Sequence, residues 1–312
     1  MPWTAAVVGT GVVGDRVGRL LSNARLVGRD RSPDVTVLAT PGPHAVTASE
    51  LARAGAHVVC TSGSLADVRD LIELDDLARA NGATIVVGAA VSPGLSGLLA
   101  RYLHDTLGHC DELHIAAHGT AGPSCAREHH DALGGWSIGW HDDGWVEHPS
   151  GSGRELCWFP EPVGARDCYR AELPDPMLLH DVFPSVERIS ARLSATRRDR
   201  FTARLPMLSP PHREGGIGAL RVEARGCDDD GARQTFVIGV AELVGTAAAA
   251  VATAFAIEIG RGTLPAGAVI AGDGALPTAS LLASIRRGGV RFQTFTGIPH
   301  PGTLSGATGT LG

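Results

Sequence analysis

The sequence predicts an α/β protein in which a domain with a parallel sheet precedes an α+β domain with a mostly antiparallel sheet. In the first third of the chain, short β-branched runs alternate with helical patterns, which is typical of parallel strands joined by helices. After about residue 111, two Asp-Asp-Gly turn signals lie between strand-like runs and favour hairpins. The length of 312 residues suits one large or two ordinary domains.

The N-terminal part contains four clear strands. Apolar and β-branched runs predict strands at 5–8, 35–39, 57–60 and 84–87. The stretches between and after them predict helices at 15–21, 45–54, 65–80 and about 92–107. Ser64 suits the N-cap of the third helix, and Pro93 suits the first turn of the fourth.

Residues 25–29 form a further candidate strand. Only about five residues would separate it from the strand at 35, whereas a parallel crossover needs about a dozen or more. Either this segment lies outside the sheet, or the helix and strand that normally follow it are missing. In both cases the parallel sheet departs from the usual pattern after its first βα unit.

The rest of the chain has the texture of a second domain. Strands are expected at 113–118, 186–194 and 220–224, with hairpin turns at Asp142-Asp143-Gly144 and Asp229-Asp230-Gly231. Helices are expected at 246–259 and 277–287, followed by a last strand at 290–295. These patterns divide the chain into residues 1–118, an α+β substrate and dimerisation domain at 119–275, and a C-terminal helix and strand with a flexible tail at 276–312.

Composition excludes several kinds of partner. The net charge of −6 and the scattered arginines form no basic stripe, so no nucleic acid is expected. The apolar run 241–259 is rich in alanine and has Glu242 and Glu258 near its ends, which favours a buried helix over a membrane span. Six cysteines without CxxC spacing and an N-terminus without a basic signal region predict a cytoplasmic protein with reduced thiols.

The chain contains no lysine, and all 27 of its basic residues are arginine. This excludes lysine Schiff-base catalysis, a Walker A phosphate loop and dehydrogenases with a lysine proton relay. The codon usage of a GC-rich genome is a sufficient cause, and the exclusions hold whatever the cause.

A glycine-rich loop carries the strongest functional signal. Gly9-Thr10-Gly11-Val12-Val13-Gly14 follows a predicted strand and precedes a helix, as the dinucleotide-binding fingerprint requires. The first glycine permits the tight turn, the second lets the backbone approach a pyrophosphate, and the third lets the helix lie against the strand. The N-terminal domain is therefore predicted to be Rossmann-like. A glycine turn without a ligand is the alternative.

Two residues bear on the choice of cofactor. Asp30 lies 21 positions after Gly9, near where the fingerprint expects an acid for the adenosine ribose. Arg29 beside it suits a 2′-phosphate, which slightly favours NADP over NAD. An exposed Arg-Asp pair without a ligand is the alternative.

Several stretches together resemble the saccharopine dehydrogenase-like family of NAD(P)-binding oxidoreductases. The resemblance spans about residues 3–118 and rests on the glycine loop, Ala39-Thr40-Pro41, Cys60-Thr61-Ser62 and the stretch 88–96, in which Ser92-Pro93-Gly94 opens a helix. A closing stretch at 289–292 resembles the family's last strand, which returns to the N-terminal domain. The compressed region at 25–35, and the absence of the lysine that some members use as a base, indicate that this is not a saccharopine dehydrogenase proper.

The resemblance implies an NAD(P)-dependent oxidoreductase, often a homodimer, that acts on a C–N bond of an amino or imino acid. It also implies that Ala39, Thr40, Pro41, Thr61 and Ser62 line the nicotinamide end of the cofactor site. Ser92, Pro93 and Gly94 open a helix, and Ser92 suits an anion contact there.

Three residues are candidates for the chemistry. Without lysine, histidine is the natural acid or base near neutral pH, and His118 ends a predicted strand. Arg127 suits a bidentate carboxylate contact, and Tyr169 suits a hydrogen bond to substrate. A hydrogen-bonded structural histidine, a surface arginine and a core tyrosine are the alternatives.

Other groups of residues give weaker functional signals. Cys125 and His129 are one helical turn apart and can be drawn with His118 as metal ligands, but no second ligand pair exists, so no metal is expected. Four tryptophans at 136–158 are expected in the core rather than around a substrate pocket. The glycine-rich segment 210–218 suits either a mobile loop or a plain linker.

These observations lead to two hypotheses. The first is an NAD(P)-dependent oxidoreductase acting on a small amino/imino- or keto-acid-like substrate. The second, motivated by the compressed region at 25–35, is a Rossmann-derived protein that has lost redox cofactor binding and acts as a non-redox biosynthetic enzyme or binding partner.

Overall fold

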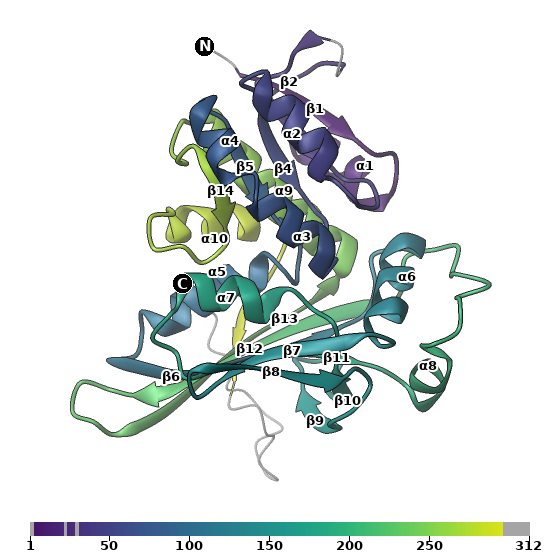
Figure 1. The fold of residues 1–312 in the computed structure, drawn as a ribbon, viewed down its shortest axis with the longest axis vertical. Coiled ribbons are helices and arrows are strands. Elements are labelled where there is room, and N and C mark those ends of the chain that lie inside the picture. The colour runs from purple at the N-terminus through teal and green to yellow at the C-terminus, as the bar shows by residue number, and fades with distance from the viewer. Residues whose placement is uncertain (1–2, 22–23, 29–30, 296–312) are drawn as a thin grey trace. The chain divides into compact units, whose positions relative to one another are not determined.

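The computed structural model describes residues 3–21, 24–28 and 31–295. The chain forms two compact units, which we call unit 1 and unit 2 (Figure 1). Unit 1 comprises Met1–Leu98 and Gly245–Val290, and unit 2 comprises Leu99–Val244 and Arg291–Gly312. The expected flexible tail from residue 297 lies outside the described residues.

Unit 1 is built on a parallel sheet of six strands in the order β14-β5-β4-β3-β1-β2. In chain order these strands are β1 Thr4–Val8, β2 Arg25–Leu26, β3 Val35–Leu38, β4 His57–Cys60, β5 Thr84–Val87 and β14 Gly267–Ile270. The expected strands are confirmed, and the parallel pairing confirms an α/β unit. All four residues of β3 and of β5 are buried, as continuous apolar strands inside a parallel sheet require.

Helices join these strands. They are α1 Val12–Leu20, α2 Ala45–Arg53, α3 Leu65–Ile72, α4 Asp75–Ala80 and the start of α5 Leu95–His104. The single helix expected at 65–80 was wrong, because Leu74 N–H bonds to Leu71 O, one residue short of the α-helical spacing, and the chain turns there. Figure 1 shows α2, α3 and α4 together on one face of the sheet.

Strand β2 resolves the question raised by the region 25–35. It pairs with β1 on the opposite side from β3, so the segment belongs to the sheet. Leu26 and Val35 both lie opposite Ala5, one on each side of β1. The connection therefore begins and ends at the same height, and no helix is needed to return the chain. The described residues 27–28 and 31–34 contain no α-helix or strand, so the alternative with missing elements is confirmed.

The C-terminal part of unit 1 differs from the expected domain division. Helix α9 Val244–Gly260 is buried along nearly its whole length, which confirms the buried helix expected at 246–259. Helix α10 Thr278–Arg287 follows β14. Unit 1 thus contains α9 and β14, which the sequence pattern assigned to the second domain. No helix among the described residues is long and apolar enough to cross a membrane.

Unit 2 is built on a nine-stranded sheet. Its main path is β15-β13-β12-β6-β11-β10-β9, and the hairpin β7–β8 joins it through β11. The strands are β6 His109–His118, β7 Trp136–His141, β8 Gly144–Pro149, β9 Glu155–Trp158, β10 Ala165–Arg170, β11 Arg188–Ser194, β12 Ile217–Cys227, β13 Arg233–Leu243 and β15 Gln293–Thr294. The only parallel pair in this described sheet is β6 with β11, so a mostly antiparallel sheet is confirmed. The helices are α6 Pro123–Ala132, α7 Asp175–Val182 and α8 Arg197–Thr202, with most of α5.

Both predicted hairpins and a last strand are confirmed, but the predicted return of that strand to the N-terminal domain is wrong. Asp142 and Asp143 have positive φ angles between β7 and β8, as this tight turn requires. Strand β15 pairs with β13 in unit 2, so it does not return to the N-terminal unit. Strand β6 also belongs to unit 2, and the first boundary falls at Leu98 rather than at residue 118. The position of β15 and that of β6 both depend on pairing between strands that are far apart in the sequence.

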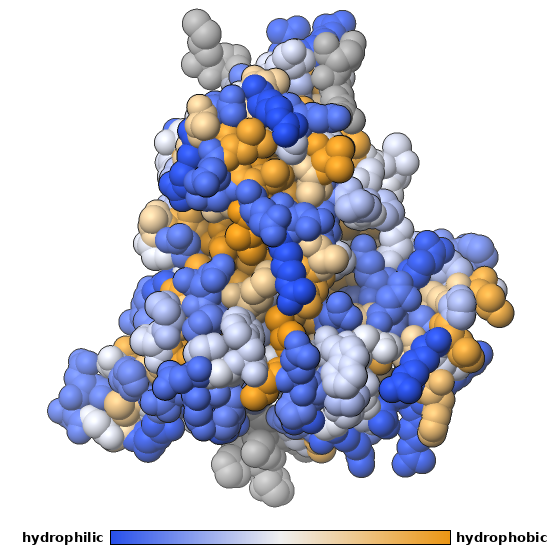
Figure 2. Space-filling model, viewed as in Figure 1, coloured by the Kyte–Doolittle hydropathy of each residue, from blue (hydrophilic) through white to orange (hydrophobic). Residues whose placement is uncertain are grey.

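The tryptophans do not form a core. Trp136 and Trp145 are 59% and 47% exposed. Trp140 stacks on the imidazole of His180, with ring centroids 3.9 Å apart. Apolar residues also reach the surface in and after α8, where Phe201 and Leu208 are 84% and 91% exposed. Figure 2 shows orange apolar residues among blue hydrophilic ones at this side of the molecule.

Two glycines of α1 provide a matched test of the turn. A Cβ at Gly14 would overlap the carbonyl oxygen of Gly9, whereas a Cβ at Gly18 meets nothing within 4 Å. We expect Gly14→Ala to lower the free energy of unfolding by about 1–3 kcal/mol. Gly18→Ala should leave it unchanged or raise it by up to about 1 kcal/mol, because alanine favours helix. Urea unfolding measures both, and equal effects of the two variants would contradict this packing.

Candidate functional site

In the glycine loop between β1 and α1, each of the three glycines has different surroundings. Gly9 has a φ of +129°, and a Cβ there would overlap the carbonyl group of Ala39 at the end of β3. Gly14 lies directly against the backbone of Gly9. At Gly11 a Cβ would meet no protein atom within 4 Å. The fold therefore requires glycine at 9 and 14, whereas at 11 it leaves open space beside an exposed backbone.

This open space adjoins the N-terminus of a helix. Gly11 is the N-cap of α1, and the first hydrogen bond of the helix runs from Asp15 N–H to Gly11 O over 3.0 Å. The N–H groups of Val12, Val13 and Gly14 precede that bond and have no acceptor within the helix. Backbone N–H groups and the helix dipole favour an anion at such a position. The loop, with Thr10 exposed at its tip, thus fits a pyrophosphate group.

The other predicted cofactor residues follow neighbouring strands of the same sheet. Ala39-Thr40-Pro41 follows β3, Thr61-Ser62 follows β4, and Ser92-Pro93-Gly94 closes the loop after β5. Because β1, β3, β4 and β5 are adjacent and parallel, these loops all lie at the carboxyl edge of the sheet. In doubly wound sheets this edge is where ligands bind.

Hydrogen bonds fix these loops to one another. Ala39 N–H donates to Val8 O over 2.8 Å, and Thr61 Oγ1 donates to Leu38 O over 2.9 Å. Gly94 has a φ of +121°, and a Cβ there would overlap the backbone of Ala90. The loop after β5 is therefore tightly folded before α5 begins.

A buried polar group supports the loop after β3, and the sequence did not reveal it. Asp67, in the first turn of α3, is 3% exposed. Its Oδ1 accepts hydrogen bonds from the N–H groups of His44 and Ala45, over 2.8 and 3.1 Å, and so caps α2 from another helix. His44 is 2% exposed, and its Nε2 donates to Thr40 O over 3.0 Å. Burial lowers the pKa of His44, so this imidazole is neutral near pH 7.

The same region contains buried polar atoms that could form further hydrogen bonds. Among the described residues, Ser62 Oγ, Asp67 Oδ2 and His44 Nδ1 are buried without a hydrogen-bond partner. A Cβ at Gly42 would lie about 3.0 Å from Ser62 Oγ and 3.1 Å from Asp67 Oδ2. Buried polar atoms are normally paired, so this edge of the sheet suits a polar ligand group or water. A sequence pattern cannot distinguish Asp67 from any acid in a first helical turn.

The edge strand next to β1, on the side opposite β3, is short. Strand β2 ends at Leu26, opposite Ala5, whereas β1 continues to Val8 and the glycine loop. Val27 N–H adds one further bond, to Ala5 O. Arg29 and Asp30, the residues expected at the ribose, lie outside the described residues.

In unit 2, His118 lies at the end of β6. Its Nδ1 is 2.6 Å from Oγ of Ser194, the last residue of the neighbouring strand β11. Burial lowers the pKa of His118, and the positive charges of Arg166 and His129 lower it further. The neutral imidazole, which can accept a proton, is therefore favoured near pH 7. Ser194 was missed, because only the β6–β11 pairing brings it to His118.

The structure does not bring the other two predicted catalytic residues to His118. Arg127 is exposed on α6. Tyr169, on β10, is 2% exposed. The guanidinium of Arg200 covers the Tyr169 ring, and the distance from the guanidinium carbon to the ring centroid is 4.2 Å. Tyr169 is therefore a core residue that has little surface for a substrate.

Two further features lie close to the end of β6 in the chain or in space. The glycine-rich segment at 210–218 contacts the turn after His118, since Gly215 N–H donates to Thr120 O over 3.3 Å. Cys125 Sγ and His129 Nε2 are 3.7 Å apart on α6. The part of the chain that the structure describes holds no group of three His, Cys, Asp or Glu side chains that could bind a metal ion.

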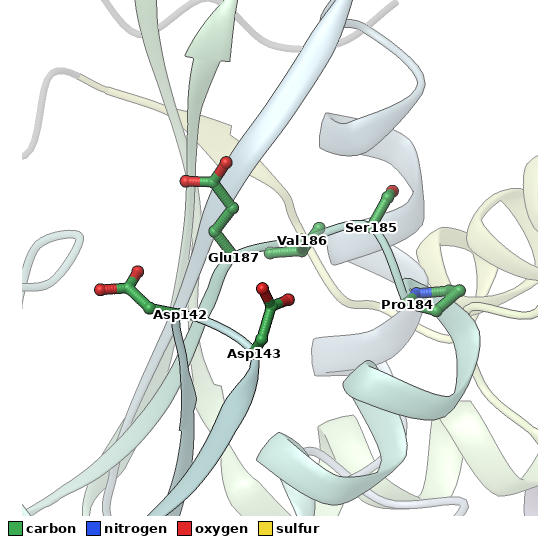
Figure 3. A pocket seen from close by; sticks show the side chains of 6 residues that line it. All are labelled: Asp142, Asp143, Pro184, Ser185, Val186 and Glu187. Carbon is green, nitrogen blue, oxygen red and sulfur yellow. The ribbon is translucent and has the colours of Figure 1, made fainter.

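A pocket of about 430 Å³ lies elsewhere in unit 2, at the β7–β8 turn. Figure 3 shows that its acidic side chains come from this turn and from the segment before β11. Its lining is Asp142, Asp143, Pro184, Ser185, Val186 and Glu187. Three carboxylates and no basic side chain line it, so it disfavours an anionic substrate or a phosphate. None of the predicted site residues lies in this pocket.

The cap formed by Asp67 gives a test of the carboxyl-edge loops. Asp67→Ala removes the acceptor of two buried N–H groups, and we expect the free energy of unfolding to fall by about 1–3 kcal/mol. Asp70→Ala, an exposed change on the same helix, should alter it by no more than about 0.5 kcal/mol. Asp67→Asn retains Oδ1 and should lie between them. Chemical denaturation that finds Asp67→Ala as harmless as Asp70→Ala would refute the cap.

Comparisons with known proteins place this fold. No protein-family model matches the sequence, and no curated protein sequence matches it. Among solved structures, apo saccharopine dehydrogenase (L-Glu forming) from Saccharomyces cerevisiae matches with a TM-score of 0.65 and 13% identity, over 94% of this chain and 100% of that chain. A mutant meso-DAPDH from Clostridium tetani, solved with DAP, matches with a TM-score of 0.52 and 12% identity, over 90% of this chain and 96% of that chain. The chain therefore has the two-part α/β fold of these dehydrogenases, as the sequence resemblance implied.

Proposed function

We propose that this chain is an NAD(P)-dependent oxidoreductase that acts on a small amino/imino- or keto-acid-like substrate. The observation that carries the proposal is the open space at Gly11. The fold itself uses Gly9 and Gly14, whereas the glycine at the helix N-terminus leaves room for a ligand to approach the backbone, as a pyrophosphate does in the dinucleotide-binding fingerprint. The fold similarity to dehydrogenases supports this reading, and the sequence resemblance supplies the substrate class.

The residues at the carboxyl edge of unit 1 fit a nicotinamide dinucleotide. The N–H groups of Val12, Val13 and Gly14 would hold the pyrophosphate, and the loops after β3, β4 and β5 would hold the nicotinamide half. When bound, the cofactor supplies hydride transfer. We propose NADP rather than NAD on the strength of Arg29 and Asp30, and we expect a cytoplasmic homodimer.

In this proposal His118 manages the proton of the substrate. Its neutral form accepts a proton when an amine or alcohol is oxidised, and it returns the proton in the reverse direction. Ser194 Oγ, 2.6 Å from Nδ1, orients the ring and leaves Nε2 for the substrate. Because the chain has no lysine, no lysine amine can act as the base in place of His118.

The short edge strand β2 favours a second candidate function. Since β2 stops opposite Ala5, a Rossmann-derived unit that binds no redox cofactor, and serves a non-redox enzyme or a binding protein, is the alternative. Cofactor binding separates the two candidates.

We expect the purified protein to bind NADPH, and more weakly NADH, in a titration followed by nicotinamide fluorescence. Gly11→Asp should weaken binding by about 100-fold or more, because it places a carboxylate at the pyrophosphate. The Cβ at this position meets no protein atom, so the thermal unfolding of this variant should stay close to that of the wild type. Lack of binding of either nucleotide by the wild type would refute the oxidoreductase. Normal binding by Gly11→Asp would show that the loop is not the site.

The titration of His118 tests its assigned role. By NMR, we expect its midpoint below the ordinary value of about 6.5. Arg166→Gln should raise the midpoint because a nearby positive charge is lost, whereas Arg127→Gln should not. The rate of substrate oxidation should rise with pH through this midpoint and then level, since the neutral base is the active form. His118→Gln should lower kcat/KM by about 10²–10⁴-fold. An unchanged rate would exclude His118 as the base.

A further inference from the structure

The pair Cys125 and His129 on α6 is not used by the proposed function. Cys125 is the third residue of α6, after Pro123 and Ser124, and His129 follows one helical turn later. Their side chains point at each other, with Sγ 3.7 Å from Nε2. A thiol within hydrogen-bond reach of an imidazole is the arrangement that activates a sulfur nucleophile.

The surroundings favour the ionised form of this pair. Burial by itself disfavours a thiolate, but the charge and the hydrogen bond of His129 outweigh it and lower the pKa of Cys125. A backbone hydrogen bond from Ala121 acts in the same direction, and the helix N-terminus favours negative charge. For His129, burial opposes the charged form, but Cys125 and the carboxylate of Glu128 outweigh it and raise its pKa. Glu128 opposes the thiolate, but it does not reverse the shift.

The other cysteines lack this combination. Cys60, Cys110, Cys157 and Cys168 are buried, and burial raises the pKa of Cys60 and that of Cys110, the latter to about 12. The pKa of Cys157 is lowered, but by a hydrogen bond with Cys168 rather than by an imidazole. Only Cys125 and Cys227 are partly exposed. Cys227 ends β12, opposite His109 of β6, and among the described residues it forms no hydrogen bond with an imidazole, so it serves as an internal reference thiol.

We propose that Cys125 is a nucleophilic thiol activated by His129, and that soft electrophiles, peroxides above all, modify this chain there. Two geometric observations carry the proposal: the approach of Nε2 of His129 to Sγ of Cys125, and the place of Cys125 in the first turn of α6. It is independent of cofactor binding, so the failure of one proposal leaves the other standing.

With hydrogen peroxide the reaction balances without any other group. The thiolate attacks one peroxide oxygen, an S–O bond forms and the O–O bond breaks. The leaving hydroxide takes the proton from Nε2 of His129 and becomes water. The products are a sulfenic acid, a neutral imidazole and water; sulfur is oxidised by two electrons and peroxide is reduced. The imidazolium thus assists departure of the oxygen as well as stabilising the thiolate.

Competitive alkylation of the full chain with iodoacetamide tests the nucleophile. Here the S–C bond forms, the C–I bond breaks and iodide leaves. At about pH 6.5, peptide mass spectrometry should show Cys125 alkylated about tenfold or more faster than Cys227. His129→Gln should slow Cys125 by about tenfold and leave Cys227 unchanged. Equal rates at the two cysteines, or no effect of His129→Gln on Cys125, would overturn the proposal.

A second measurement does not depend on the folding of the His129 variant. The ultraviolet absorbance of thiolate in the wild type, minus that of Cys125→Ser, should titrate well below the ordinary thiol value of about 8.5. A difference titration at or above that value would contradict activation. After peroxide treatment, dimedone should label Cys125 and not Cys227. Rapid alkylation of Cys125 without dimedone labelling would overturn the assignment to peroxides.

Discussion

The close backbone approach at Gly9 is the constraint on which unit 1 depends. At this residue the end of β1 passes against the carbonyl group of Ala39, and Gly14 brings the start of α1 against Gly9 itself. A side chain at either position would separate β1 from β3 or α1 from β1. Because these two contacts fix the turn, the N-terminus of α1 and the loop after β3 are held at one edge of the sheet. Gly11 lies between the two constrained glycines and is constrained by neither.

The second determinant of unit 1 is the length of β2. A parallel connection without a helix is possible only because Leu26 and Val35 lie at the same height on either side of Ala5. The consequence is an edge strand that stops three residues before the end of β1, roughly 10 Å at the usual rise per residue. In the function that we propose, the pyrophosphate loop and the edge formed by β3, β4 and β5 hold the dinucleotide.

In unit 2, His118 at the end of β6 and His129 in the last turn of α6 have opposite properties. His118 lies beside a serine hydroxyl, and burial, together with the nearby positive charges, lowers its pKa and favours its neutral form. His129 faces a thiol and a carboxylate, so it favours the charged form. Environments that shift two like groups apart allow one to accept protons and the other to stabilise a negative charge. The positive charge of His129 also contributes to the shift of His118, so the chemistry of Cys125 and the titration of His118 are linked.

The local features of the chain followed from its sequence. Strand positions, the glycine loop, the Ser64 N-cap, both Asp-Asp-Gly turns and the buried alanine-rich helix depend on residues close to one another in the chain. The segment between residues 26 and 35 is too short for a crossover helix. The sequence therefore left two possibilities: this segment lies outside the sheet, or the helix and strand that normally follow it are missing. Within unit 1, the rule that parallel strands end at one edge placed the candidate cofactor loops together.

Tertiary structure decided what depends on pairing between distant segments. The recruitment of α9 and β14 into unit 1, and of β6 and β15 into unit 2, follows from sheet neighbours separated by many residues. For the same reason Ser194 reaches His118, Asp67 caps α2, and Tyr169 lies in the core under Arg200. A residue type and its neighbours in sequence determine what a side chain can do. Only the packing of other segments against it determines whether it is buried, which partner it has, and which protonation state it favours.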